Sequence, residues 1–254
     1  MDIFESNTQN GYPIIVPSYI NGYHILKILN KGSTCFVVLV EDQEAKEKYA
    51  AKIISKADAI ENNTYQLIIK EIDILKSISH ENIVKLYDDF DIENDYGECF
   101  IVLIMEYCQN GDFLSYITTN TIDVDIKISM FYKTLLAIKY LHDKEISHGD
   151  FKSENILLDS HFVPKLCGFC YARTKSIAGN ESKHGTLYYA APELFERGIF
   201  NTLKTDIYAI GITLYSIVEL TFPFKNGDEN HIMKQIIRGK FSLENNMSEQ
   251  FLSL

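Results

Sequence analysis

The sequence contains no tryptophan and only 5 prolines and 13 glycines in 254 residues. So little proline and glycine excludes collagen-like and low-complexity structure. No run is long and apolar enough to cross a membrane: the most apolar one, residues 207–220, lies between Asp206 and Thr221. The first ten residues lack the basic start and apolar core of a signal peptide. We therefore expect no membrane partner, and a buried helix at residues 207–220.

Basic side chains are also scarce. Lys and Arg number 24 against 35 Asp and Glu, which gives a net charge of −11. Binding to nucleic acid or to an anionic membrane surface needs clustered positive charge, so we expect neither as a partner. A basic peptide or protein suits this surface better. The five cysteines are odd in number and irregularly spaced, which predicts no disulfide scaffold and a reducing, cytoplasmic location, with the nucleus left open.

What is present is a globular composition, with 46% hydrophobic and 23% charged residues. Strand-length apolar runs dominate before residue 107, interrupted by one helix, and helical periodicity dominates after it. We therefore expect an α+β fold with a small, mainly β lobe and a larger, mainly α lobe. The predicted strands are 23–29, 36–40, 49–54, 83–90 and 99–105, and the predicted helices are 59–78, 113–118, 126–141, 206–220 and 230–239.

One position in the first predicted helix stands out. Glu71 shares a helix face with Ile68, Ile72 and Leu75, at spacings of three and four residues. A carboxylate on an apolar face is costly to bury unless a cation meets it. Glu71 is therefore expected to have a basic partner.

Three segments carry residues suited to chemistry, but each alone has a simpler structural explanation. Gly32 lies between two predicted strands, as in an ordinary hairpin turn. Lys52 lies on a strand in YAAKII, where an inward lysine commonly extends its ammonium group toward water. HGDFKSENILL places Asp150, Lys152 and Asn155 on a loop, where each could be a turn residue or a helix cap.

In this order and at these spacings, the segments together resemble the eukaryotic protein kinase family. HGDFKSEN and GTLYYAAPE are similar to the Ser/Thr class, near the calcium/calmodulin-dependent and AMP-activated branch. The resemblance implies a bilobal kinase-like fold after a leader at 1–22, with an N-lobe at 23–105, a hinge at 106–109 and a C-lobe at 110–254. It covers about residues 20–254 and runs through the loop around Gly32, AAK, KEIDILKSISHENIVKLY, IMEYCQNGDFLSYI, YLHDKEISHGDFKSENILL, GTLYYAAPE and DIYAIG.

The resemblance also implies roles in ATP-dependent phosphoryl transfer to protein Ser/Thr, a reaction that depends on positioning and charge neutralisation. Lys52, held by Glu71, would bind the α- and β-phosphates. Asp150 would orient and deprotonate the substrate hydroxyl, with Lys152 near the transferring phosphate and Asn155 on a metal ion.

Further roles follow from the same resemblance. Asp112 would meet a basic residue of the substrate, and Asp206 would anchor the catalytic loop. Lys152, and Thr186 next to Gly185, are residues that Ser/Thr kinases typically have at these positions. The nucleotide pocket would be formed by Gly32, Val37, Ala50, Lys52, Met105 as gatekeeper, the backbone groups of Glu106 and Cys108, and Leu157.

Two departures from the family's motifs weaken the expectation of phosphoryl-transfer activity. The glycine-rich loop usually has three glycines, whereas these positions read Asn30, Gly32 and Cys35, so we expect weak ATP binding. The usual His-Arg-Asp reads His148-Gly149-Asp150. Because the arginine that reads a phosphorylated activation loop is absent, we expect no activation by that route.

A third departure concerns the metal. The Asp-Phe-Gly motif is absent from PKLCGFCYART, and the usual spacing from Asn155 puts Gly168 where the aspartate belongs. Either Gly168-Phe169-Cys170 replaces the motif, or its Asp and Phe were deleted after Cys167; we favour the deletion. Both alignments leave Mg²⁺ without its main anionic ligand. The formal C-x-x-C of Cys167 and Cys170 is not expected to have a redox or metal function.

The fourth departure is length, since family members continue through further helices. We expect a truncated C-lobe, a Glu193 without its usual arginine, and exposed apolar surface. Either a protein partner covers this surface or the fold is only marginally stable. Three functions stay open. The favoured one is a pseudokinase that serves as a binding module; the others are a Ser/Thr kinase with residual activity, because Asp150 remains, and a degenerate gene copy without function.

Overall fold

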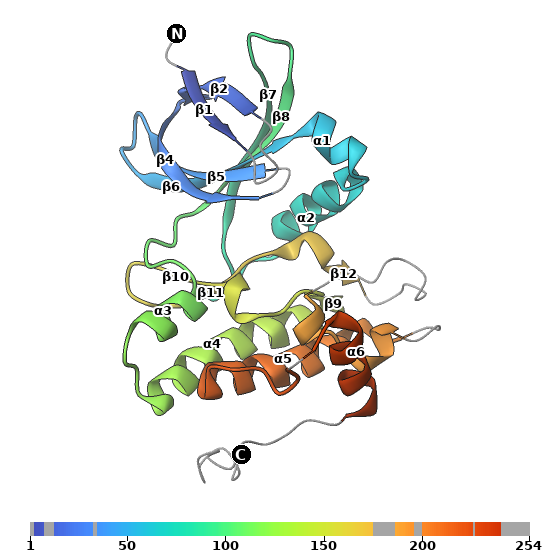
Figure 1. Cartoon of the computed structure of the whole chain (residues 1–254). Coiled ribbons are helices and arrows are strands. Elements are labelled where there is room, and N and C mark those ends of the chain that lie inside the picture. The colour runs from blue at the N-terminus through green and yellow to red at the C-terminus, as the bar shows by residue number, and fades with distance from the viewer. Residues whose placement is uncertain are drawn as a thin grey trace. The chain divides into compact units, whose positions relative to one another are not determined.

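The computed structural model describes residues 3–7, 13–32, 35–174, 186–195, 200–225 and 227–239. The chain divides into two compact units, which are described separately. The first comprises residues up to 79 together with 84–109, and the second comprises residues 80–83 and those from 110 onward (Figure 1). One unit is mainly β and the other mainly α, which is the α+β fold that the sequence predicts.

A six-stranded antiparallel sheet forms the first unit. Two short helices follow its third long strand, α1 (Lys56–Glu61) and α2 (Tyr65–Ser77). In spatial order the strands are β3 (Tyr19–Ile20), β4 (Tyr23–Lys31), β5 (Cys35–Asp42), β6 (Lys48–Ser55), β8 (Cys99–Glu106) and β7 (Leu86–Glu93).

The two faces of this sheet have different neighbours, because side chains alternate along each strand. On one face, Ile54 and Leu103 pack against Ile68 and Ile72 of α2. On the other face, alternate residues of the same strands form a second apolar cluster that includes Ala51, Ile53, Val102 and Ile104. A strand such as β6 therefore contributes side chains to two separate cores.

The helix predicted over residues 59–78 is two helices, which corrects the sequence-based expectation. Asn62 ends α1, and the next residue, Asn63, has a left-handed backbone with φ of +56°. Asparagine tolerates this conformation better than most residues because its short amide side chain can bond locally. The Asn-Asn-Thr stretch is the signal of this break.

The residues assigned to a leader contain three strands. β1 (Ile3–Asn7) pairs with β2 (Pro13–Pro17) in an antiparallel hairpin, and β3 follows at once. Val16 and Ile20 are buried in the apolar cluster of the sheet. The side-chain amide of Asn94 donates a hydrogen bond of 2.8 Å to the Ile15 carbonyl, which fixes β2 to the turn between β7 and β8.

The second unit is built on helices. No helix in the described parts of the chain is both long and apolar enough to span a membrane. Four short strands form two antiparallel pairs, β10 with β11 and β9 with β12. The elements are α3 (Phe113–Thr119), α4 (Val124–Asp143), β9 (Ile146–Ser147), β10 (Ile156–Leu158), β11 (Pro164–Leu166), β12 (Arg173–Thr174), α5 (Thr202–Glu219) and α6 (Glu229–Arg238).

Helices α4 and α5 run antiparallel, as contacts at their two ends establish. The buried ammonium group of Lys127, near the start of α4, donates to the Ile217 carbonyl in the last turn of α5 at 3.4 Å. At the other end, His142 of α4 contacts Asp206 of α5. A cation at a helix C-terminus is favourable because the free carbonyl groups there carry partial negative charge. This pairing fixes the position of Asp206.

Candidate functional site

In the first unit, Lys52 and Glu71 form the ion pair that the sequence predicts. The Lys52 Nζ atom lies 2.8 Å from Glu71 Oε2, and the two side chains are 16% and 4% exposed. Lys52 comes from β6 and Glu71 from α2, so the pair joins the sheet to its helix. Water screens so buried a pair only weakly, which keeps both side chains in place.

The loop around Gly32 is closed by Cys35. The Gly32 N–H donates to the Cys35 carbonyl at 2.7 Å, and a β-carbon on Gly32 would lie 3.0 Å from the Cys35 sulfur. The thiol points to the α2 side of the sheet, where burial and the Glu71 carboxylate raise its pKa, while Lys52 lowers it by less than burial raises it. The cysteine is therefore a neutral, packed side chain. Ser33 and Thr34 lie outside the described residues.

The other residues assigned to a nucleotide pocket in this unit are near the same ion pair. Val37 pairs with Lys52 across β5 and β6, and Ala50 pairs with Met105 across β6 and β8. Cross-strand partners share a face, so these side chains lie on the α2 side of the sheet. The Glu106 N–H donates to the Lys85 carbonyl at 2.9 Å, and Cys108 is buried.

In the second unit, Asp206 holds the loop that follows β9. Its Oδ1 accepts a hydrogen bond from the Gly149 N–H at 2.9 Å. Its Oδ2 accepts from the His148 N–H and from the His142 ring, both at 2.8 Å. Asp206 is 1% exposed, and three donors offset the cost of burying its charge. The anchoring contact expected of Asp206 is present.

The buried ring of His148 is part of the same loop. Burial lowers its pKa from 6.5, more than the Asp206 carboxylate raises it, so the ring is neutral at pH 7. The Asp150 N–H donates to Nδ1 at 3.3 Å, which leaves the proton on Nε2, and Nε2 donates to the Cys167 carbonyl at 2.9 Å. His148 therefore joins the loop to the segment after β11.

Asp150 lies at the centre of a small polar network. Lys152 Nζ contacts Asp150 Oδ2 at 2.8 Å and donates to Thr186 Oγ1 at 2.8 Å. The Asn155 amide donates to the Asp150 carbonyl at 2.7 Å and to its Oδ2 at 3.0 Å. The structure thus brings together four residues that the sequence assigns to catalysis and metal binding. This arrangement holds a carboxylate beside an ammonium group and a hydroxyl.

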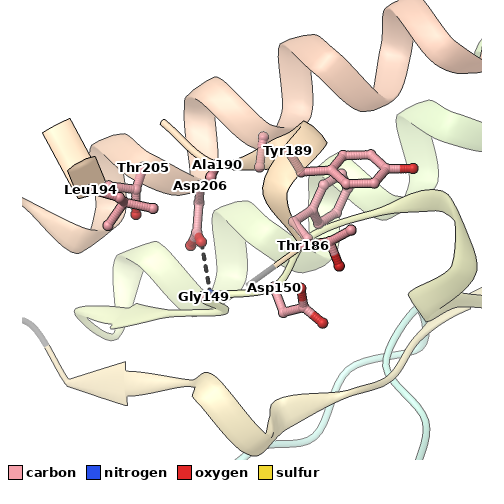
Figure 2. Close-up of a pocket in the computed structure, with 10 residues that line it drawn as sticks. Gly149, Asp150, Thr186, Tyr189, Ala190, Leu194, Thr205 and Asp206 are labelled. Carbon is pink, nitrogen blue, oxygen red and sulfur yellow. Dashed lines mark hydrogen bonds between the residues drawn. The ribbon is translucent and has the colours of Figure 1, made fainter. Parts of the chain in front are cut away.

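A small hollow, partly open to solvent, adjoins this network. Figure 2 shows the Asp206 carboxylate turned toward Gly149, and Asp150 lying with Thr186 at the same end of the pocket. Its lining residues are Gly149, Asp150, Phe151, Thr186, Tyr189, Ala190, Leu194, Thr205, Asp206 and Ala209. Asp150 and Thr186 therefore line the hollow as well as belonging to the polar network.

Gly168 lies directly against the side chain of Asn155. Its φ of +81° is left-handed, and a β-carbon there would lie 2.8 Å from the Asn155 amide nitrogen and amide carbon. Such contacts are too short unless the amide moves. The next residue, Phe169, is 1% exposed and packs edge-to-face on His148 at 5.0 Å between ring centroids.

Gly149 has even less room for a β-carbon than Gly168 has. Its φ is +78°, and the space that a β-carbon would need is occupied by the carbonyl group of Tyr171. The segment that follows Phe169 is held there by β12, which pairs with β9 through Arg173 and Ser147. No side chain fits at position 149 with this backbone.

Acidic side chains do not cluster as metal ligands in the described part of this unit. Among the described residues, no group of three or more His, Cys, Asp or Glu side chains could hold a metal ion. The Asp150 carboxylate is engaged by Lys152 and Asn155. The nearest carboxylate before Gly168 in the sequence is that of Asp159, and it accepts hydrogen bonds from the N–H groups of His161 and Val163 in its own turn. Among the described residues, Cys167 and Cys170 belong to no such group.

Two remaining candidate residues belong to the second unit. Asp112 is the N-cap of α3, where Oδ1 accepts from the Ser115 N–H and Oδ2 from the Ser115 hydroxyl. Both oxygens of the predicted substrate-binding residue therefore have a structural partner. Leu157 lies on β10 and forms an isolated bridge with Asp112.

Sequence reasoning missed His142 and the Tyr171 backbone. The sequence offered a signal for His142, because it directly follows the predicted helix 126–141 in the segment YLHDKEISHGD, six residues before His148. It offered none for Tyr171, because the contact is made by a carbonyl group that every residue has.

The chain is similar to known proteins over most of its length. Residues 23–254 match the family model described as "Protein kinase domain". The chain is 28% identical over 235 residues to the serine/threonine-protein kinase SIK1 of Mus musculus, covering 92% of this chain and 29% of that protein. It is 32% identical over 233 residues to a probable myosin light chain kinase of Dictyostelium discoideum, covering 90% of this chain and 47% of that protein. The chain thus spans less than half the length of either relative.

Proposed function

The chain belongs to the protein kinase family, with Ser/Thr kinases among its relatives, and we propose that it is a pseudokinase. Members of this family use ATP, generally with Mg²⁺. In this proposal the fold binds ATP weakly, has lost efficient phosphoryl transfer to protein Ser/Thr, and serves as a binding module. The observation that carries it is the contact of Gly168 with Asn155, at the position where the family has a metal-binding aspartate.

The same contact supports substitution of the motif over the deletion that the sequence favoured. Two side chains that ligate one metal ion must adjoin each other, and position 168 adjoins Asn155. A deletion would also have removed the apolar Phe of the motif, whereas Phe169 is fully buried against His148. We infer that Gly168-Phe169-Cys170 stands in place of Asp-Phe-Gly.

The residues present do not fit Mg²⁺. This ion prefers carboxylate, phosphate and water oxygens in a near-octahedral arrangement. Position 168 has no side chain, and the Asp150 carboxylate, which contacts Asn155, already meets Lys152. Phosphoryl transfer assisted by Mg²⁺ is therefore not part of the proposed function.

The residues that remain can still bind a nucleotide. Lys52 is held by Glu71 on the same sheet face as Val37 and Ala50, so an ammonium group and apolar side chains adjoin each other. This arrangement suits a phosphate next to an adenine ring. With Asn30 and Cys35 in place of two loop glycines, the binding is proposed to be weak.

A second candidate function, residual Ser/Thr kinase activity, is favoured by one observation. Asp150, Lys152 and Thr186 keep the contacts by which a carboxylate could accept the proton of a substrate hydroxyl beside a cation. A positioned general base alone contributes about 10²- to 10⁴-fold to a rate.

We further propose a cytoplasmic protein with a basic protein or peptide as partner. The net charge of −11 supports this partner. Asp112 would bind a basic side chain only in addition to capping α3, because both of its oxygens accept from Ser115.

Thermal stability with ATP tests nucleotide binding. A ligand stabilises a protein by RT ln(1 + [L]/Kd), so weak binding at millimolar ATP gives only a small rise in Tm. We expect the same rise in EDTA and in Mg²⁺, and its loss in Lys52→Met. The control is Lys56→Met, which removes a neighbouring, more exposed lysine paired with Asp91. A rise that requires Mg²⁺ would contradict the proposal.

Transfer from γ-labelled ATP to a basic Ser/Thr peptide tests the chemistry. We expect the wild-type chain and Asp150→Asn to show the same background level of phosphoryl transfer. Transfer by the wild type that Asp150→Asn abolishes would establish residual kinase activity instead. Asp143→Asn, which changes an exposed carboxylate paired with Lys139, controls for the loss of one charge.

A further inference from the structure

The sheet face opposite α2 carries a row of four aromatic rings, Tyr87, Tyr49, Tyr23 and Phe90, here called the aromatic row. Tyr87 meets Tyr49 at 5.0 Å between ring centroids, Tyr49 meets Tyr23 at 5.9 Å, and Tyr23 meets Phe90 at 6.5 Å. The first two contacts are edge-to-face. Tyr87 is 49% exposed and the other three rings are partly buried. The row therefore presents π-surface to solvent on one side of the first unit.

The strand registers place these rings on one face. Tyr49 alternates with Lys52 along β6, so it points away from α2, and Phe90 pairs with Val102 of the same face. A register shift in β7 between Leu86 and Asp88 breaks the alternation at Tyr87. Bulges of this kind re-aim a side chain, and here the result is that Tyr87 reaches Tyr49.

Carboxylates surround the tyrosine hydroxyls. The Tyr49 hydroxyl donates to Glu47 at 2.8 Å, which is the largest cause of the rise in its pKa to about 12. Burial, Asp88 and Asp42 raise the pKa of Tyr23. The phenols of Tyr49 and Tyr23 therefore stay neutral at physiological pH, with acidic side chains next to them.

One cation already lies on the aromatic row. The ammonium group of Lys85 is 4.5 Å from the centroid of the Tyr87 ring. Attraction of a cation to the face of an aromatic ring is electrostatic, and it strengthens when water is excluded. The geometry of the row thus accepts a positive charge over a ring within this chain.

We propose that the aromatic row is a docking surface for an arginine-containing basic segment of a partner protein. A guanidinium group stacks on aromatic faces and forms paired hydrogen bonds with carboxylates, and the row offers both. The net charge of −11 attracts such a segment from a distance. This surface lies on the first unit and is separate from Asp112, which belongs to the second.

Titration with a short, fluorescently labelled peptide of alternating arginine and glycine tests the proposal. We expect binding at peptide concentrations up to about 1 mM, and a three- to tenfold weaker affinity in Tyr87→Leu. A peptide with citrulline in place of arginine has the same shape without the charge, and it should not bind. The matched control is Tyr96→Leu, which changes another tyrosine, 68% exposed, that is outside the row.

Lys85→Ala gives a second, opposite expectation. Because Lys85 covers the Tyr87 ring and repels a basic peptide, its removal should strengthen arginine-peptide binding about two- to fivefold. A gain of affinity cannot result from damage to the fold. In Tyr87→Leu there is no ring for Lys85 to cover. The double variant, Lys85→Ala with Tyr87→Leu, should therefore bind the arginine peptide no more tightly than Tyr87→Leu does, once the loss of the Lys85 charge is taken into account.

Three results would overturn the proposal. The first is absence of arginine-peptide binding at 1 mM. The second is equal loss in Tyr87→Leu and Tyr96→Leu, which would mean that the peptide binds the acidic surface at large. The third is binding of the citrulline peptide with the same affinity, which would mean that the row recognises no cation.

Discussion

The carbonyl group of Tyr171 occupies the space that a β-carbon on Gly149 would need. The arginine that the family usually has at this position is therefore excluded by the backbone as well as missing from the sequence. Tyr171 is held by its neighbours on both sides, Phe169 in the core and Arg173 in β12. The glycine in His148-Gly149-Asp150 is thus a packing requirement of this chain.

We expect Gly149→Ala to lower the free energy of unfolding by about 3 kcal/mol, measured by urea denaturation. About 1 kcal/mol comes from an alanine at positive φ, and the rest comes from the collision with Tyr171. Gly97→Ala is the control, since Gly97 has the same φ of +78° and nothing within 4 Å of a β-carbon. Equal costs in the two variants would mean that the backbone of Tyr171 moves aside freely.

Gly168→Asp restores the missing carboxylate, but we expect it to restore no phosphoryl transfer. The new side chain would displace the Asn155 amide and break its two hydrogen bonds to Asp150, at a cost of about 2 kcal/mol in unfolding free energy. Kinase assay and urea denaturation of the same sample measure both effects. Recovery of Mg²⁺-dependent transfer would show that Asn155 adapts and that the rest of the site is competent.

Two tyrosines of the second unit should respond oppositely to the loss of a hydroxyl. The Tyr208 hydroxyl is buried and has no hydrogen-bond partner among the described residues, and burial with Glu193 nearby raises its pKa to about 12. Tyr208→Phe should therefore stabilise the chain by about 1 kcal/mol.

Tyr189→Phe is the matched change. The Tyr189 hydroxyl donates to Glu154 at 2.9 Å, and its loss should destabilise the chain by about 1 kcal/mol. Thermal unfolding of both variants gives the comparison. A fall in Tm for Tyr208→Phe would mean that its hydroxyl has a partner after all.

Stability should fall as the pH drops below about 6.5, because of His148. Burial depresses its pKa from 6.5, so the unfolded state binds a proton that the folded state does not. Stability from this group is full above pH 6.5 and is lost as the pH falls toward the depressed value. The slope cannot exceed about 1.4 kcal/mol per pH unit for one proton.

Urea denaturation between pH 7 and pH 5 measures this slope. We expect His148→Gln to be less stable at pH 7 but to show a shallower dependence. His161→Gln serves as the control, because the residue is exposed. An unchanged slope in His148→Gln would assign the pH dependence to other groups.

Periodicity predicted the fold class and the long elements because these depend on one-dimensional patterns. Four of the five predicted strands and four of the five predicted helices overlap closely with single observed elements. The strand expected from Ile83 begins at Leu86, since Ile83 instead pairs with Leu166 in the second unit. The expected partner of Glu71 is also present, since a buried carboxylate demands a cation.

Features that depend on packing could not be predicted in this way. The capping of α3 by Asp112 depends on its backbone geometry and on the Ser115 N–H, and no pattern in the sequence predicted it. The strands before residue 23 carry no long apolar run, yet Val16 and Ile20 fill the core. The bulge that turns Tyr87 toward Tyr49 has no glycine to mark it. In each case tertiary contacts decide among conformations that the local sequence permits.

The alternation along β6 links two surfaces that share no residue. Lys52 points to α2 and Tyr49 to the aromatic row, and the pairing of β6 with β5 and β8 sets both directions at once. A single inserted residue between them would invert one set of side chains relative to the other. Natural variation could change either surface by substitution, but not by insertion or deletion within this strand. The chemistry of the α2-facing surface and that of the aromatic row must therefore evolve at constant strand length.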